Sequence, residues 1–153
     1  VLVVASAEAV SKAIEALRSA GSNAQVVTLS NNASGGFIKS LGTKAHGVVV
    51  TQVFPNERTL TFGLVKEMLE QAKAHNIPQA SPAMLEGFAG AKVLVEALRR
   101  AGPKPSREKV HAALEGMGKF DLGGLELGYS PTDHTGLDFT DLSIISSQGN
   151  FRR

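Results

Sequence analysis

The stretch VLVVASAEAVSKAIEALRSAGSNAQVVTL, residues 1–29, decides the fold. Its beginning, Val1–Ala5, is short, apolar and rich in β-branched residues, which is typical of a buried strand. Ser6 is placed to cap a helix, apolar residues follow at helical spacing, and Gly21 is placed to end that helix. Gln25–Leu29 then has the composition of a second strand. A strand, a helix and a strand within about 30 residues form a βαβ unit, so we expect the two strands to be parallel.

The same alternation continues toward the third strand. The segment SNNASGG, Ser30–Gly36, is a polar loop, and a short helix is predicted at Gly36–Leu41. His46–Phe54 is a third predicted strand, and because it shows almost no polar alternation we expect it to be covered on both faces. The pattern predicts an α/β fold with a mostly parallel sheet flanked by helices.

The middle of the chain changes character. Three helices are predicted with no strand between them, at Leu60–His75, Met84–Arg100 and Arg107–Met117. From Gly118 onward the pattern indicates loops and short strands, and Leu137–Ser146 is the last predicted strand. We expect the three helices to form a second cluster, packed away from the first sheet.

Composition excludes several classes of protein. The chain has 153 residues, 42% of them hydrophobic and 20% charged, which is typical of a globular protein. Its 16 basic residues are scattered, without a stripe of Lys or Arg interleaved with aromatics, so we do not expect nucleic acid as a partner. The absence of cysteine excludes disulfides, a thiol nucleophile and cysteine-type zinc sites. The chain opens directly on a strand-like run, without a visible signal peptide, so we expect a processed chain or a piece of a larger one.

The segment SPTDHTGLDF, residues 130–139, holds the one pair of residues that could carry chemistry. Asp133 and His134 are adjacent and are flanked by the hydroxyls of Thr132 and Thr135. A catalytic role would need partners elsewhere, but the chain has no G-x-S-x-G motif, and its histidines lack metal-ligand spacing. Proline, aspartate and glycine are common in turns, so we interpret the segment as a turn, and we expect no metal and no cofactor.

A binding site is predicted where the parallel strands end. Ser6 and Ser30 follow the first two predicted strands. Ligands of open α/β sheets bind at the carboxyl ends of the strands, so both serines could face one crevice. Ser6 could serve as a helix cap at the same time. The loop that begins at Ser30 lacks the lysine of a P-loop, so we do not interpret it as a phosphate site.

Several stretches, in this order, resemble one family: VLVVASAEAVSKAIEALRSAGS, HGVVVTQVFP, SPAMLEGFAGAKVLVEALRRAG, FDLGGLELGYSPTDHTGLDF and a terminal GNF. Together they resemble the periplasmic substrate-binding proteins of branched-chain amino acid type ABC transporters, also called the receptor-family ligand-binding domain. The resemblance covers the whole chain but only the C-terminal portion of such a protein. It implies a periplasmic-binding-protein type I fold, in which two α/β lobes are joined by three crossovers, and here a partial two-lobed fold.

The resemblance also implies a division of the chain. Residues 1–50 would belong to the second lobe, 51–55 would be a crossover, 56–129 would be the helical part of the first lobe, and 130–153 would hold a crossover turn and the C-terminal strand of the second lobe. The sheet of the first lobe would be missing, so the helix Met84–Arg100 would expose apolar area. We therefore expect the chain to associate with itself or with its missing N-terminal half.

The function that the resemblance implies is capture of a small organic solute, an amino acid or carboxylate, and its delivery to a membrane permease in the periplasm, without enzymatic activity. Two alternatives stay open: the ligand-sensing domain of a signalling receptor with the same fold, and an α/β hydrolase-like enzyme that uses Asp133 and His134. The residues that would bind the ligand are Ser6, Ala7, Ser30, Asn31 and Leu85. The residues that would form the hinge are Thr51, Gln52, Val53 and His134.

One departure from the family matters for the ligand. Amino acid binders of the family place an aromatic side chain where Ser6 stands and an acid where Ser30 stands. The acid pairs with the ammonium group of the ligand, and a serine cannot supply that charge. The resemblance therefore implies an uncharged or anionic solute at least as readily as leucine, isoleucine or valine.

Overall fold

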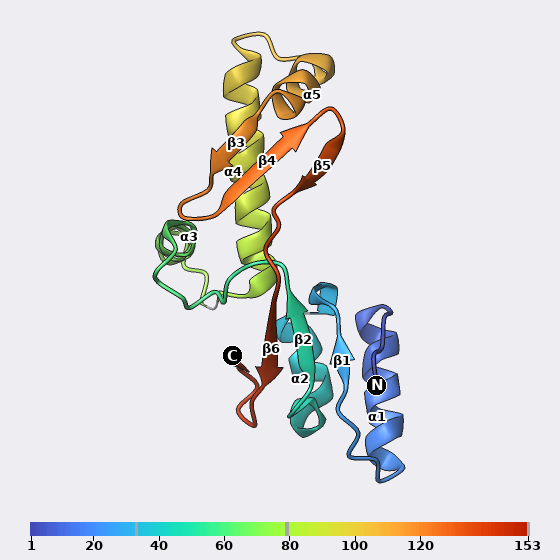
Figure 1. Ribbon diagram of the computed structural model, residues 1–153. Coiled ribbons are helices and arrows are strands. Elements are labelled where there is room, and N and C mark those ends of the chain that lie inside the picture. The colour runs from blue at the N-terminus through green and yellow to red at the C-terminus, as the bar shows by residue number, and fades with distance from the viewer. Residues whose placement is uncertain (33, 79, 153) are drawn as a thin grey trace. The chain divides into compact units, whose positions relative to one another are not determined.

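The computed structural model describes residues 1–32, 34–78 and 80–152 (Figure 1). The chain forms two compact units. Unit 1 consists of Val1–Asn56, Ser81–Ala83 and Phe139–Arg153, and unit 2 consists of Glu57–Ala80 and Met84–Asp138. Of the predicted polar loop, Ala33 lies outside the described residues.

Unit 1 is built on a four-stranded sheet in the order β1-β2-β6-β7. The strands β1 and β2 are parallel, while β6 pairs antiparallel with β2, and β7 antiparallel with β6. The sheet is therefore mixed, and its parallel part is the part that the βαβ pattern predicts. The elements of unit 1 are α1 (Ala7–Ser19), β1 (Val27–Thr28), the 3-10 helix η1 (Ser30–Asn32), α2 (Gly35–Leu41), the 3-10 helix η2 (Gly42–Ala45), β2 (Val49–Gln52), β6 (Asp141–Ile145) and β7 (Phe151–Arg152).

The first five residues run parallel to β1, as the sequence predicts, but the contact is shorter than a full strand pair. Leu2 forms an isolated parallel bridge with Val27. The Val3 amide donates to the Val27 carbonyl, and the Val27 amide donates to the Val1 carbonyl, each at 2.9 Å. The predicted strand at Val1–Ala5 is thus reduced to a single bridge, while the parallel direction of the two segments is as the pattern predicts.

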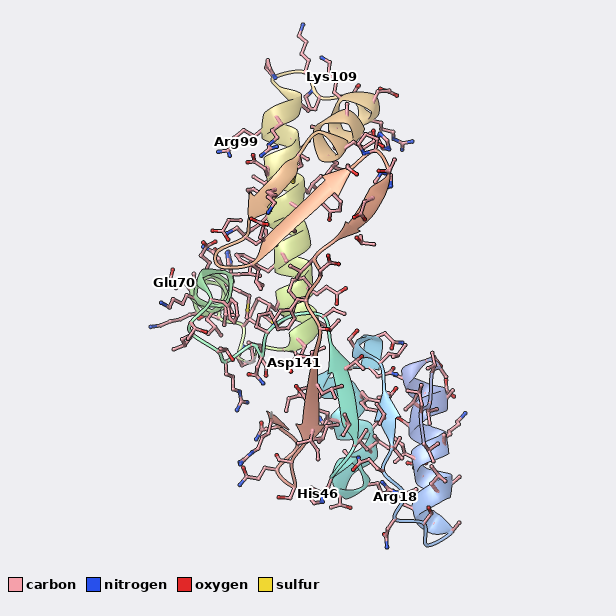
Figure 2. All side chains as sticks on the ribbon, viewed as in Figure 1. Arg18, His46, Glu70, Arg99, Lys109 and Asp141 are labelled. Atoms are coloured by element: carbon pink, nitrogen blue, oxygen red, sulfur yellow. The ribbon has the colours of Figure 1, made fainter. Side chains whose placement is uncertain are left out.

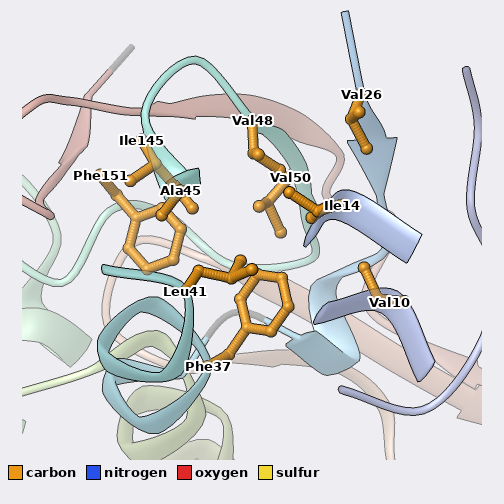
Figure 3. Close-up of a cluster of buried hydrophobic side chains, with 10 residues drawn as sticks. All are labelled: Val10, Ile14, Val26, Phe37, Leu41, Ala45, Val48, Val50, Ile145 and Phe151. Carbon is orange, nitrogen blue, oxygen red and sulfur yellow. The ribbon is translucent and has the colours of Figure 1, made fainter. Parts of the chain in front are cut away.

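The core of unit 1 lies between one face of the sheet and the helices α1 and α2 (Figure 3). The helix α1 contributes Val10 and Ile14, and α2 contributes Phe37 and Leu41, all of them buried. Burial alternates along β2, so Val50 is buried while the opposite face is only half-buried. The prediction that this strand is covered on both faces is therefore wrong for the described residues, because both helices lie on the same side. The strands contribute Val50, Ile145 and Phe151 to the core, and Val26 and Val48 directly precede β1 and β2.

The helices begin at the serines that their sequences provide. The amide of Ala9 donates to the Ser6 hydroxyl at the start of α1, and the amide of Lys109 donates to Ser106 at the start of α5. These bonds satisfy amides that a helix leaves without partners in its first turn. The predicted cap at Ser6 is confirmed.

Unit 2 combines helices with a three-stranded antiparallel sheet in the order β3-β4-β5. The predicted turn at residues 130–139 contains a short strand, β5, which pairs with β4. The last predicted strand, Leu137–Ser146, is shorter than expected, because β6 spans only its second half and lies in unit 1. The elements are α3 (Gly63–Ala74), α4 (Pro82–Ala101), α5 (Arg107–Glu115), β3 (Gly118–Asp121), β4 (Glu126–Ser130) and β5 (Asp133–Gly136).

In unit 2, buried side chains come from α3, α4 and the segments around the sheet. One face of α4 is buried through Leu85, Ala89 and Val93, while its opposite face leaves Leu94 51% and Val95 65% exposed. The expectation of an exposed apolar area on this helix agrees with these values. The other large buried residues of unit 2 are Leu64, Val65, Met68, Met117, Leu122, Leu125 and Leu127.

Charged side chains are spread over both units. Arg18 and His46 lie on unit 1, and Glu70, Arg99 and Lys109 lie on unit 2 (Figure 2). Among the described residues, no helix is both long and apolar enough to cross a membrane.

Candidate functional site

Five residues lie where the parallel strands of unit 1 end, and we call them the carboxyl edge: Ser6, Ala7, Ser30, Asn31 and Thr51. Ser6 and Ala7 follow the first segment, Ser30 and Asn31 follow β1 after a single residue, and Thr51 lies near the end of β2. Because parallel strands end on the same side of a sheet, the fold gathers these residues from three separate parts of the sequence.

Ser6 stands at the N-terminus of α1. Its hydroxyl accepts a hydrogen bond from the Ala9 amide at 3.4 Å, and its side chain is exposed. The helix N-terminus carries a partial positive charge, which favours a neutral or negative group beside it. The nearest acid in the helix, Glu8, already pairs with Lys12 at 2.6 Å.

Ser30 and Asn31 connect the ends of neighbouring strands. The Ser30 amide donates to the Thr51 hydroxyl at 3.1 Å, which joins the end of β1 to β2. The Asn31 side-chain amide donates to the Ala5 carbonyl at 3.4 Å, which joins η1 to the first segment. The sequence therefore predicts correctly that Ser6 and Ser30 follow neighbouring strands, while their contact with a ligand stays a prediction.

Asn32 follows Asn31 and supports the carboxyl edge from within the unit, a role that the sequence did not identify. It is fully buried, and its Nδ2 donates to the Thr28 hydroxyl at 2.9 Å and to the Ala5 carbonyl at 3.3 Å. The Thr28 hydroxyl in turn donates to the Val3 carbonyl at 3.0 Å. Asn32 thus ties the loop after β1 to the first segment. The polar run SNN indicates a turn, but only the folded structure shows which of its asparagines is buried.

Leu85 belongs to α4, in unit 2. It is fully buried, so it could contact a solute only if the packing around it opened. Its role as a lining residue stays a prediction.

The predicted hinge residues of the first crossover belong to β2 or follow it directly. Thr51 and Gln52 are strand residues of unit 1, and Val53 is 39% exposed. Gln52 is buried, and its Nε2 has no hydrogen-bond partner among the described residues. The chain passes from unit 1 to unit 2 after Asn56. Hinge motion at these residues stays a prediction.

Asp133 and His134 each have a separate partner in unit 2. Asp133 Oδ1 accepts from the amide and the hydroxyl of Thr135, at 3.0 and 2.6 Å, and these bonds lower the pKa of its carboxyl. His134 Nε2 lies 3.2 Å from Glu115 Oε1. Within the described residues no hydrogen bond joins Asp133 to His134, so the pair lacks the geometry of a catalytic dyad.

Glu115 stands between two histidines. The second, His111, places Nδ1 3.5 Å from Glu115 Oε2, and its ring meets that of His134 edge to face with centroids 6.2 Å apart. This cluster fastens β5 to α5 inside unit 2, and the role of His134 in a hinge stays a prediction. In the part of the chain that the structure describes, no group of three or more acidic or histidine side chains could hold a metal ion.

The chain belongs to the periplasmic binding protein family, because residues 1–140 match the model of that family. The resemblance seen in the sequence is confirmed. None of the proteins with curated descriptions matches the chain.

Solved structures confirm the type I fold. A possible leucine/isoleucine/valine-binding protein from Rhodopirellula baltica is 29% identical, with a TM-score of 0.88 over 99% of this chain and 42% of its own. A substrate-binding periplasmic protein from Ralstonia solanacearum is also 29% identical, with a TM-score of 0.85 over 98% of this chain and 44% of its own. A branched-chain amino acid ABC transporter protein from Thermus thermophilus with bound valine shares the fold at 20% identity, with a TM-score of 0.79 over 99% of this chain and 44% of its own. The chain therefore spans less than half the length of these relatives.

Proposed function

We propose that this chain is part of the solute-binding component of an ABC-type uptake system. It captures a small organic solute between two lobes in the periplasm and delivers it to a membrane permease. Family membership and the type I fold support this role, because such proteins bind solutes by closing two lobes around them. The protein acts by binding and release, not by catalysis, in keeping with the separate partners of Asp133 and His134.

The observation that carries the proposal is the lack of charge along the carboxyl edge. Its residues are two serines, an alanine, an asparagine and a threonine. A buried ammonium group needs a negative partner. Without one, the free energy lost when the ammonium group leaves water is larger than hydroxyl and amide dipoles can restore. The group of the solute that meets unit 1 is therefore uncharged or anionic. A carboxylate fits best, because the N-terminus of α1 lies at this edge.

Other residues have supporting roles in this proposal. Ala7 and Leu85 provide apolar lining, as binding sites of small organic molecules require. Thr51, Gln52 and Val53 absorb the backbone change of closure. His134 keeps β5 fastened to α5 through Glu115 while the lobes move.

The variant Ser6→Asp tests the charge argument. Aspartate caps helices as well as serine does, so the free energy of unfolding should change little. Its negative charge should repel an anionic solute, and the affinity for carboxylates should fall by about tenfold or more, on the order of 1.4 kcal/mol. The measurement is isothermal titration of the two-lobed protein, paired with thermal unfolding. Ser106→Asp, at the N-cap of α5, is the matched control and should leave the affinity unchanged. Equal carboxylate binding by the Ser6→Asp variant would contradict the proposal.

A further inference from the structure

Unit 1 has a pocket of about 410 Å³ where β1 and β2 begin, and we call it the amino pocket. It is formed by α1 together with residues 23–25, which precede β1, and residues 43–47, which precede β2. Because parallel strands begin on the same side of a sheet, the pocket lies at the end opposite the carboxyl edge. Arg18 and His46 both lie at this end of unit 1 (Figure 2). The lining residues include Arg18, Gln25, Thr43, Lys44, His46 and Gly47.

Hydrogen bonds between separate segments hold the walls of the amino pocket in place. The Gln25 side-chain amide donates to the Gly47 carbonyl, which joins the segment before β1 to the segment before β2. Arg18 Nη1 donates to the carbonyls of Ser22 and Ala24, at 2.9 and 3.0 Å. These two bonds fix the guanidinium beside the pocket. The walls are therefore shaped by contacts within unit 1.

The charged side chains that line the amino pocket are all basic. Arg18 and Lys44 carry positive charges, and His46 adds an imidazole that gains one when it is protonated. Within the described chain, no carboxylate lies within ion-pair distance of any of the three. Both hydrogen bonds from Arg18 to described residues use Nη1, so the N–H groups of Nε and Nη2 are available to another acceptor.

The distribution of charge over the chain has the same direction. Unit 1 holds six lysines and arginines against three acids, whereas in unit 2 the acids are in the majority. Two acids of unit 1 lie toward the carboxyl edge, because Glu8 is in the first turn of α1 and Asp141 pairs with Gln52 at the end of β2. The third, Glu15, does not line the amino pocket. An end of a unit with unbalanced positive charge attracts anions.

We propose that the amino pocket binds a phosphate group. The fork of an arginine side chain matches phosphate oxygens, and a lysine adds a point charge. The volume of the pocket is in the range of small-molecule sites, so it has room for a small group attached to the phosphate. Two sources share this chemistry: phosphate or a phosphate ester in solution, and the headgroup of an anionic phospholipid. This inference goes beyond the proposed function, because the solute meets unit 1 at the other end of the sheet.

The ring proton resonances of the histidines test where phosphate binds. His46 lines the amino pocket, while His75, His111 and His134 belong to unit 2. Inorganic phosphate added to the two-lobed protein should shift the ring resonances of His46 in a saturable manner and leave the other three in place. The variant His46→Gln identifies these resonances. Sodium chloride at the same ionic strength should have a much smaller effect, because screening depends on ionic strength and not on the identity of the anion.

The variant Lys44→Gln tests the role of charge. The side chain is exposed, so the free energy of unfolding should change little. The affinity for inorganic phosphate should fall by at least about fivefold, because a charged donor is lost. Lys39→Gln removes the same charge from the exposed surface of α2 and is the matched control, which should leave the affinity unchanged. Both affinities are read from the shift of the His46 resonances during a phosphate titration.

Vesicles separate the two sources of phosphate. If the ligand is a lipid headgroup, the protein should sediment with vesicles of phosphatidylglycerol but not with vesicles of phosphatidylcholine, whose phosphate is balanced by a cation. Lys44→Gln should then weaken this sedimentation. If the protein binds inorganic phosphate but sediments with neither vesicle, the ligand is a phosphate group in solution.

Two results would overturn this proposal. The first is that phosphate shifts the His46 resonances no more than chloride does, or no more than those of the other histidines. The second is equal affinity for phosphate in Lys44→Gln and the parent. The first comparison uses the unsubstituted protein, so failure of a variant to fold does not remove the test. Solute affinity is measured separately, so this inference can fail while the proposed function stands.

Discussion

Asn32 shows how much of the candidate site depends on a single side chain. It is the fully buried residue that ties η1 to Thr28 and to the first segment, while its neighbour Asn31 is exposed. Replacing Asn32 with alanine leaves the Ala5 carbonyl and the Thr28 hydroxyl without this donor. We expect the free energy of unfolding to fall by about 1–3 kcal/mol. The measurement is denaturant unfolding, and Asn31→Ala should cost much less. An equal loss in both variants would show that burial of Asn32 does not matter.

Glu57 is a second residue whose environment leads to a prediction. Its side chain is buried, Oε2 has no hydrogen-bond partner among the described residues, and burial raises the pKa of the carboxyl. Folding therefore favours the protonated acid. The stability that this group contributes is present below the pKa of the unfolded chain and is lost as the pH rises through the raised pKa of the folded state.

The variant Glu57→Gln should remove this pH dependence, because glutamine is neutral at every pH. The variant should match the parent in acid and become more stable than the parent as the pH rises toward neutral, because only the parent then has to ionise a buried group. Unfolding is measured across the pH range, with Glu70→Gln on the exposed surface of α3 as control. A difference between Glu57→Gln and the parent that stays constant with pH would contradict the assignment.

For single residues, the sequence predicted helix caps but not the hydrogen-bond partners of side chains. A serine before an apolar helical pattern is a local signal, so Ser6 and Ser106 could be identified from their neighbours alone. The contact between His134 and Glu115 joins residues 19 positions apart, and the buried Asn32 bonds to Ala5, 27 positions away. Neither has a local pattern in the sequence.

At the scale of elements, the turn between β3 and β4 meets the start of α3 at a glycine. Gly123 has φ +101°, and its carbonyl accepts from the Leu64 amide at 3.1 Å. A Cβ there would lie 2.6 Å from Leu64 N, closer than two such atoms can approach. The variant Gly123→Ala should therefore lose about 2 kcal/mol or more of stability.

Gly87 provides the matched control for that substitution. It lies inside α4, where an added Cβ would meet no atom within 4 Å. Because alanine favours a helix over glycine by up to about 1 kcal/mol, Gly87→Ala should be neutral or stabilising. The measurement is the melting temperature of both variants. Equal melting temperatures would refute the proposed backbone contact at Gly123.

The helices were easier to predict than the strands, and the reason is physical. The helix α4 carries its own periodic pattern over 20 residues, so its prediction needs no knowledge of its neighbours. The strands of unit 2 have four or five residues and are interrupted by glycines, and β5 consists of DHTG. The segment DHTG has no strand pattern of its own, so its sequence predicts a turn. It is a strand in the structure because it pairs with β4.

At the scale of the whole molecule, the order of stretches identified the type I fold, which the comparisons confirm. The predicted boundaries of the two lobes stay predictions. In the structure the chain passes between the two units after Asn56 and after Asp138, and Ser81–Ala83 also belongs to unit 1. The expectation of coverage on both faces of β2 was wrong for this chain, yet it followed from the correct rule that parallel sheets are covered by helices.

The central claim is that the solute meets unit 1 with an uncharged or anionic group. The most direct measurement is the thermal unfolding of the two-lobed protein with two matched ligands, L-leucine and 4-methylpentanoate, which share a carbon skeleton but differ in the amino group. At a concentration of about 100 times its dissociation constant, a bound ligand stabilises the folded state by about 2.7 kcal/mol. The account predicts that carboxylates without an amino group raise the melting temperature more than their amino acid counterparts do, and that Ser30→Glu reverses this order. Stabilisation by leucine alone would contradict it.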